Sequence, residues 1–315
     1  MAWELKEPDE YQSSYLFKWG SKIAKLLDHV KVPYVAWGDL MNSHMIRDSD
    51  TNWGCLSWYG HLGFVVSDDR FDAAIRALRV AGLSEDSCYP EYCHWANGPE
   101  SCRLPYPWPA HHFHHYVDDV KWVRGKQIKC YPVGLYRKSQ WLWLLPDLPL
   151  DFPEPNDPNF MLSTDRRLPD WDVEGFGNSF HPIKLLTPVR WIESLICQTI
   201  RDLSLKGNRG RARHIPVEEF HQRLARQLPP ELFHLDLLQQ PFRTIYKLST
   251  AGDFGMYPLL WLCLDGIWEE WQETGSMPDP VLPFNNKTKK RRIEEYRSQH
   301  GFSRNKVSEM LRNGI

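Results

Sequence analysis

The stretch that decides the fold passes from an apolar run into a helical pattern: Phe64-Val65-Val66-Ser67-Asp68-Asp69-Arg70-Phe71-Asp72-Ala73-Ala74-Ile75-Arg76-Ala77-Leu78. The apolar run predicts a buried strand over residues 62–66. The spacing of the apolar residues that follow predicts a helix over residues 69–81, which Gly82 ends. A buried strand leading straight into a helix indicates an α/β domain.

Three carboxylates gather at this junction, and we call Asp68, Asp69 and Asp72 the acidic junction. On a helix, residues three or four apart are neighbours, so Asp72 is near both of the others. Like charges at this spacing are unfavourable unless a cation neutralises them. A guanidinium would do so through charge-assisted hydrogen bonds, and a divalent metal through oxygen ligands. Helix capping is the structural alternative, because Asp is a preferred N-cap residue.

The remaining pattern indicates further helices and strands. Helices are expected at 12–31, 39–46, 188–203, 217–228 and 257–273, and strands at 32–37, 111–117 and 133–136. Five prolines fall within residues 146–158, where they break regular structure. We therefore expect an α/β domain over 1–150, a mainly helical domain over 151–284 and a basic tail over 285–315.

Charge is unevenly distributed along the 315 residues. Residues 285–315 carry nine Lys and Arg against three Glu, a net charge of +6, so residues 1–284 carry −8 of the total of −2. A basic tail can contact phosphates, or it can be a solvated surface segment. The seven cysteines are spread over the chain, which favours thiols over disulfides. We expect a cytoplasmic protein that makes no contact with membranes.

Histidines and other reactive side chains supply further candidates. In a strand over 111–117, His112 and His114 share one face, where either could transfer protons. Ser67 and Cys55 are possible nucleophiles, and Glu193 is a possible acid or base that could instead pair with Arg190. The residues Cys88, Cys93, His94 and Cys102 lack a standard zinc-ligand spacing, so we expect no metal site.

A strand, the turn Gly38-Asp39, a short helix and the strand Gly60-His61-Leu62-Gly63-Phe64-Val65-Val66 together resemble the nucleotidyltransferase fold. The resemblance implies a mixed sheet flanked by helices. Members of that family carry Asp-x-Asp just before the second strand, where the carboxylates hold Mg²⁺. Here His61 and Gly63 occupy those positions, and they cannot replace two oxygen ligands. Ordinary nucleotidyl transfer is therefore not expected.

Several motifs together resemble the fungal arginine-containing cyclodipeptide synthases: Asp68-Asp69-x-x-Asp72, Pro109-Ala110-His111-His112-Phe113-His114 and Leu135-Tyr136-Arg137-Lys138-Ser139. That family is associated with Asp-Asp-x-x-Glu, and Asp72 stands at the Glu position with a side chain one methylene shorter. The resemblance implies that arginine is joined to a second amino acid to form a diketopiperazine, with both drawn from aminoacyl-tRNA and no cofactor. It covers about residues 30–205.

The resemblance implies roles for particular residues. We expect catalytic or arginine-binding roles at the acidic junction, proton transfer at His112 and His114, and substrate contacts at Asp39, His61, Ser67 and Glu193. The tRNA phosphates require basic contacts. Candidates are Arg209, Arg211, Arg213, Lys289, Lys290, Arg291 and Arg292. The last four also resemble a weak nuclear-targeting cluster. The alternatives are a nucleotidyltransferase-like enzyme of another acceptor and a non-catalytic binding protein.

Overall fold

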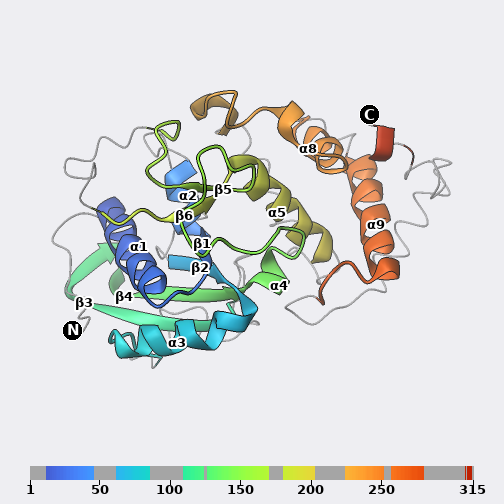
Figure 1. The fold of residues 1–315 in the computed structure, drawn as a ribbon. Helices are drawn as coiled ribbons and strands as arrows, with labels where there is room; N and C mark the ends of the chain where they lie inside the picture. The colour runs from blue at the N-terminus through green and yellow to red at the C-terminus, as the bar shows by residue number, and fades with distance from the viewer. Residues whose placement is uncertain are drawn as a thin grey trace. The chain divides into compact units, whose positions relative to one another are not determined.

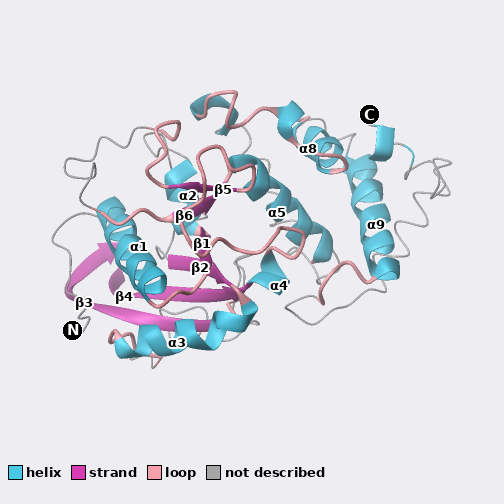
Figure 2. Ribbon diagram, viewed as in Figure 1, coloured by secondary structure: helices cyan, strands magenta, loops and turns pink. Residues whose placement is uncertain are grey.

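The computed structural model describes residues 12–45, 62–85, 109–123, 126–169, 180–202, 224–251, 257–279, 309 and 311–313. These residues form two compact units, one ending at Thr187 and the other beginning at Pro188. The first unit is mixed α/β and holds every strand described, whereas helices predominate in the second (Figure 2). Within the described ranges, no helix is long and apolar enough to cross a membrane.

A mixed sheet of four strands forms the centre of the first unit, in the order β1-β2-β4-β3 (Figure 1). β2 (Leu62–Val66) and β4 (Lys126–Arg137) are parallel neighbours. β1 (Tyr34–Trp37) pairs antiparallel with β2, and β3 (His111–Val123) pairs antiparallel with β4. Since β2 and β4 run the same way, the segments that follow both strands lie at one edge of the sheet.

Helices follow the strands closely in the first unit. α1 (Gln12–His29), α2 (Asp39–Met45) and α3 (Phe71–Val80) contact one another or the sheet. A short 3₁₀ turn, η1 (Asp68–Arg70), joins β2 to α3. The first turn after β2 is therefore 3₁₀ rather than the α-helix expected from residue 69. α4 (Lys138–Trp141) follows β4 directly.

Two of these helices end in Schellman motifs, in which a residue in the left-handed region satisfies the last carbonyls. Gly82, with φ 93°, ends α3 as its sequence predicted, and Leu83 N donates to the carbonyl of Leu78 at 3.1 Å. Lys31, with φ 56°, ends α1 in the same way. These stops fix where β1 begins after α1 and where the chain leaves α3.

A small second sheet extends the first unit beyond the expected boundary at residue 150. β5 (Phe160–Leu162) pairs antiparallel with β6 (Lys184–Leu186), and β6 contacts β1. The first compact unit therefore continues to Thr187. The prolines of residues 146–158 interrupt regular structure, but they do not separate the two units. The strands β5 and β6, which follow the prolines in the sequence, have buried apolar side chains.

The described part of the second unit consists mainly of helices. α5 (Pro188–Arg201) contacts α8 (Phe242–Thr250) and α9 (Tyr257–Thr274), and a 3₁₀ turn, η3 (Leu235–Leu237), lies before α8. The helices expected over 188–203 and 257–273 are confirmed within two residues at each end. No helix was expected where α8 lies. The predicted helix at 217–228 falls partly outside the described residues.

Gly63 allows β1 and β2 to approach closely. A Cβ added at this position would lie 2.6 Å from the carbonyl oxygen of Trp37, which belongs to the paired strand. That atom is backbone and cannot rotate away. An aspartate at this position, as in a nucleotidyltransferase metal pair, would meet the same obstruction.

We predict that Gly63→Ala lowers the unfolding free energy by about 1–3 kcal/mol, the usual cost of overpacking. Gly20→Ala is the matched control, because the nearest atoms to its added Cβ belong to side chains, Leu40 at 2.7 Å and Ile183 at 3.3 Å. Leu40 and Ile183 can adjust their rotamers, and alanine favours the helix. Urea denaturation of both variants measures the difference. Equal losses of unfolding free energy in the two variants would contradict the backbone clash.

Candidate functional site

Asp68 of the acidic junction is anchored to the segment that follows β4. The Ser139 backbone N–H donates to Oδ2 of Asp68, and the Ser139 hydroxyl donates to Oδ1, both at 2.8 Å. Asp68 therefore satisfies an N–H in the first turn of α4. The N-cap residues of η1 and α3, Ser67 and Arg70, make no side-chain cap of their own. Helix capping, the structural alternative for Asp68, therefore occurs at α4, where Ser139 lies 71 residues further along the chain.

A guanidinium of the chain itself lies beside this carboxylate. Nη1 of Arg137, the last residue of β4, is 3.9 Å from Oδ1 of Asp68. The guanidinium carbon of Arg137 lies 4.1 Å from the centroid of the Phe71 ring. A carboxylate and an aromatic face are the two groups that a guanidinium prefers. The junction thus already holds one arginine side chain.

Asp69 and Asp72 remain exposed at the same place. Arg70 Nε lies 3.7 Å from Oδ2 of Asp69, and the Asp69 side chain is 76% exposed. Asp72 lies in the first turn of α3 and is also exposed. Asp68 lies in the 3₁₀ turn, so the expected pairing of Asp68 with Asp72 on one α-helical face does not occur. The junction is divided into one anchored carboxylate and two that face solvent.

The histidines of β3 alternate as the strand pattern predicted. The rings of His112 and His114 lie 5.0 Å apart, whereas the His111 ring is 4.7 Å from that of Phe113. His114 is buried, and its backbone N–H donates to the carbonyl of Ser84 at 2.6 Å. Burial, with the nearby charges of His114 and His111, lowers the pKa of His112 to about 4. A pKa that far below neutrality makes His112 a weak base.

His111, which received no predicted role, joins a small polar group beside the junction. Its Nε2 lies 2.6 Å from Oε1 of Glu85, the same oxygen that Arg79 contacts from α3. The hydrogen bonds from Arg79 hold the pKa of Glu85 below its usual value. His111 pairs with Leu135 of β4, so it begins β3 at the edge of the sheet where β4 ends.

Asp39 and Ser67 lie at opposite edges of the sheet. Ser67 follows β2, and its N–H donates to the carbonyl of Pro33 at 3.2 Å, beside the start of β1. Asp39 follows the other end of β1, since Trp37 pairs with Gly63. The length of β2 separates them, about 13 Å at the usual rise of a strand. The buried carboxylate of Asp39 adds to burial in holding the pKa of Tyr136 well above its usual value.

Glu193 lies on α5 in the second unit and is buried. Oε2 of Glu193 contacts Nη1 of Arg190 at 2.6 Å, and Oε1 accepts the Gln239 N–H at 2.9 Å. The pairing of Glu193 with Arg190, which the sequence offered as the alternative to an acid–base role, is present. The pair is largely buried rather than solvent-facing. Oε1 attaches α5 to the segment before α8, and Oε2 is paired within α5, so Glu193 has a structural role.

Several predicted residues lie outside the described part of the chain. They are His61, Cys55, Arg209, Arg211, Arg213, Lys289, Lys290, Arg291, Arg292 and the cysteine-rich group Cys88, Cys93, His94 and Cys102.

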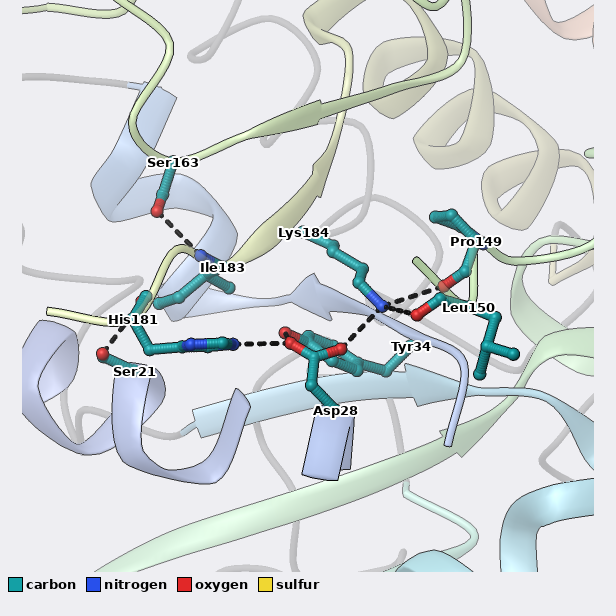
Figure 3. A network of polar contacts seen from close by, with 9 residues as sticks. All are labelled: Ser21, Asp28, Tyr34, Pro149, Leu150, Ser163, His181, Ile183 and Lys184. Carbon is teal, nitrogen blue, oxygen red and sulfur yellow. Dashed lines mark hydrogen bonds and ion pairs between the residues drawn. The ribbon is translucent and has the colours of Figure 1, made fainter. Parts of the chain in front are cut away.

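A second polar group lies at the junction's edge of the sheet, and we call Asp28, Tyr34, His181 and Lys184 the Asp28 network (Figure 3). Oδ2 of Asp28 contacts Nε2 of His181 at 2.6 Å and accepts the Tyr34 hydroxyl at 3.1 Å. Oδ1 of Asp28 contacts Nζ of Lys184 at 2.7 Å. Burial, and then the charge of Asp28, hold the pKa of Tyr34 well above its usual value, so its hydroxyl remains a donor.

Lys184 contacts three oxygen atoms of other residues through Nζ. Beyond Asp28, Nζ donates to the carbonyl oxygens of Leu150 at 2.6 Å and Pro149 at 3.0 Å (Figure 3). The side chain is 0% exposed. Burial lowers the pKa of Lys184, and its interaction with the Asp28 carboxylate opposes that shift. The ammonium is therefore a structural group that joins α1, β6 and the proline-rich segment.

Sequence reasoning missed this network, although two signals pointed to it. Asp28 lies in the last turn of α1, where the helix dipole disfavours a carboxylate. Lys184 lies within the apolar run Ile183-Lys184-Leu185-Leu186, where a cation requires a partner. Neither signal identifies the other residue, because they are 156 positions apart in the sequence.

Comparison with known proteins adds no assignment: no family model, curated protein or solved structure matches the chain.

We predict that acid weakens folding partly through His112. The folded pKa of about 4 lies below the ordinary 6.5, so the unfolded state binds a proton first as the pH falls. The contribution of His112 to the free energy of unfolding is fully present above pH 6.5 and is lost as the pH falls toward 4. Urea denaturation of His112→Asn at pH 7 and at lower pH should show a smaller acid-induced loss than the wild type. His29→Asn, at an exposed histidine, should retain the full loss; the same loss in both variants would contradict the assignment.

We also predict that Lys184→Met is strongly destabilising. It leaves Asp28 without its cation and two carbonyls without a donor, and breaking a buried pair costs about 3–5 kcal/mol. Lys31→Met is the matched control, since Lys31 is exposed and lies close enough for its charge to act on Lys184. Chemical denaturation compares the two variants. A loss at Lys184 no larger than at Lys31 would show that the network does not hold β6 in place.

Proposed function

We propose that this chain is an aminoacyl-tRNA-dependent cyclodipeptide synthase that joins arginine to a second amino acid. The proposal includes a nucleotidyltransferase-like arrangement of the first unit. Asp69 and Asp72 bind the arginyl side chain, and Asp68 positions the turn that carries them. The observation that carries the proposal is the division of the acidic junction into one anchored and two exposed carboxylates.

The junction has the chemistry that a guanidinium requires. Asp68 is held by Ser139 on both of its oxygens, so the turn from β2 into α3 is fixed relative to β4. Arg137 lies near Asp68, and the exposed side chain of Arg70 lies near Asp69. An external guanidinium would bind between Asp72 and Asp69 and take the place of Arg70 beside Asp69. In open α/β sheets, ligands bind beyond the carboxyl ends of parallel strands, where these residues lie.

The reaction needs binding and positioning more than an external energy source. The amino group of one aminoacyl ester attacks the ester carbonyl of the other, an amide bond forms, and a tRNA ribose hydroxyl leaves. A second attack within the dipeptidyl ester closes the ring and releases the other tRNA. Holding the two esters together supplies much of the acceleration. The tRNA would contact the basic residues of the 209–213 segment and of the tail.

A nucleotidyltransferase with another acceptor is the rival activity. It would require Mg²⁺ ligands at positions 61 and 63. Position 63, near the start of β2, is Gly63, which is enclosed by the Trp37 backbone. A side chain at that position does not fit without moving a strand, so the usual pair of carboxylates is excluded there.

We predict that a host expressing the full chain, fed isotopically labelled arginine, accumulates a labelled cyclic dipeptide detectable by mass spectrometry. Asp69→Asn/Asp72→Asn should lower its yield by at least about tenfold, because hydrogen bonds to charged groups contribute about 1.5–3 kcal/mol each. Asp147→Asn is the matched control, since Asp147 is an exposed aspartate elsewhere in the first unit, and it should retain the wild-type yield.

No labelled product from soluble, folded wild-type protein would overturn the proposal. Binding of ATP with Mg²⁺ would then favour the nucleotidyltransferase reading, and its absence would favour a non-catalytic binding protein. A wild-type yield from the double variant would overturn the role of the two exposed carboxylates alone.

A further inference from the structure

His181 presents one ring nitrogen to a carboxylate, and its side chain is partly exposed. Nε2 lies 2.6 Å from Oδ2 of Asp28, and Figure 3 shows the ring directed at that carboxylate. An ionised carboxylate can only accept, so Nε2 carries the proton and Nδ1 of the neutral ring carries a lone pair. Among the described residues, none hydrogen-bonds to Nδ1. The side chain is 21% exposed.

The charges around the ring allow it to be neutral. Lys184 neutralises Asp28 through the other carboxylate oxygen at 2.7 Å, so that carboxylate does not require a cationic imidazole. The Tyr34 hydroxyl donates to the oxygen that His181 contacts. Lys31 and Asp151 act on Lys184 with opposite signs, and Phe152 packs against the imidazole with ring centroids 5.6 Å apart. Hydrolytic triads also orient a histidine through a carboxylate, although there the carboxylate faces Nδ1 and Nε2 is the base.

The backbone holds His181 in place independently of its ring. The Ser21 hydroxyl donates to the carbonyl oxygen of His181 at 2.9 Å, which attaches this segment to α1 (Figure 3). The ring can therefore be altered while the segment remains attached. This separates a chemical role of the imidazole from its structural role.

The Asp28 network and the acidic junction share one edge of the sheet. Tyr34, the first residue of β1, pairs with Val66, the last residue of β2. Asp68 comes two residues after Val66, and the Ser67 N–H donates to the carbonyl of Pro33. Both groups belong to the first compact unit.

We propose that Asp28 and His181 form an acid–base pair at this edge, with Nδ1 of His181 as the general base for amide formation. The inference rests on the proposed function. The incoming aminoacyl ammonium first loses one proton to solvent. The free amine then attacks the ester carbonyl, and Nδ1 accepts a second proton from the nitrogen as the carbon–nitrogen bond forms. The imidazolium gives this proton to the ribose oxygen as the ester carbon–oxygen bond breaks, which releases the ribose hydroxyl and restores the neutral ring.

The decisive variant is His181→Gln. The glutamine amide nitrogen can take the place of Nε2 and donate to Asp28, but it offers no basic nitrogen. With purified protein, arginyl-tRNA and the second aminoacyl-tRNA identified from the labelled product, the maximal rate should fall at least about 100-fold, the usual contribution of a general base. The wild-type rate should also decline at acid pH as the imidazole is protonated, and the variant should lose that dependence.

His29→Gln is the matched control, an exposed histidine on α1 one residue after Asp28, and it should retain both the rate and the pH profile. Nitrogen-15 NMR of the wild-type imidazole gives a readout that needs no substrate: Nε2 should carry the proton and Nδ1 should be bare near neutral pH.

The outcomes separate the two proposals. An active wild type with an equally active His181→Gln variant overturns the general base and leaves the synthase proposal standing. Protonation of Nδ1 throughout the neutral range also overturns it. A folded wild type that makes no cyclic dipeptide overturns the synthase proposal, and with it the reaction assigned to this base, even if NMR shows a bare Nδ1.

Discussion

The ion pair between Asp28 and Lys184 is the interaction on which the first unit depends. Both groups are largely or fully removed from water, which is costly for isolated charges. The cost is offset because the ammonium lies 2.7 Å from the Asp28 carboxylate and donates to two backbone carbonyls of the proline-rich segment. A single cation thereby joins α1, β6 and residues 149–150. This explains why the compact unit continues to Thr187 although the prolines interrupt regular structure.

The sheet imposes the second constraint, through the parallel pairing of β2 with β4. That pairing places the ends of both strands at one edge, where Asp68 meets Ser139 and Arg137. Antiparallel pairing of β1 with β2 places the start of β1, and with it the Asp28 network, at the same edge. The same geometry places Asp39 at the far edge, although in the sequence it lies close to the start of β1.

The two polar groups at this edge differ in how they are built. The acidic junction has one carboxylate fixed by hydrogen bonds and two exposed to solvent, a form suited to binding a cation. The Asp28 network has a carboxylate shared between a buried ammonium, a phenol and an imidazole that is partly exposed. That form holds the ring in one orientation. The proposed aminolysis of an ester would use both groups at this edge of the sheet.

The sequence by itself determined the elements with strong local patterns: the apolar strand β2, the amphipathic helices α1, α3, α5 and α9, and the stop at Gly82. It also identified the acidic junction, because three aspartates within five positions are visible without a structure. Three-residue strands such as β5 and β6 are too short to show a period. Only the tertiary structure decided that Asp68 binds Ser139, that Asp39 is remote and that His181 faces Asp28. Those contacts join positions 71 to 153 residues apart, and a local pattern carries no information about such pairing.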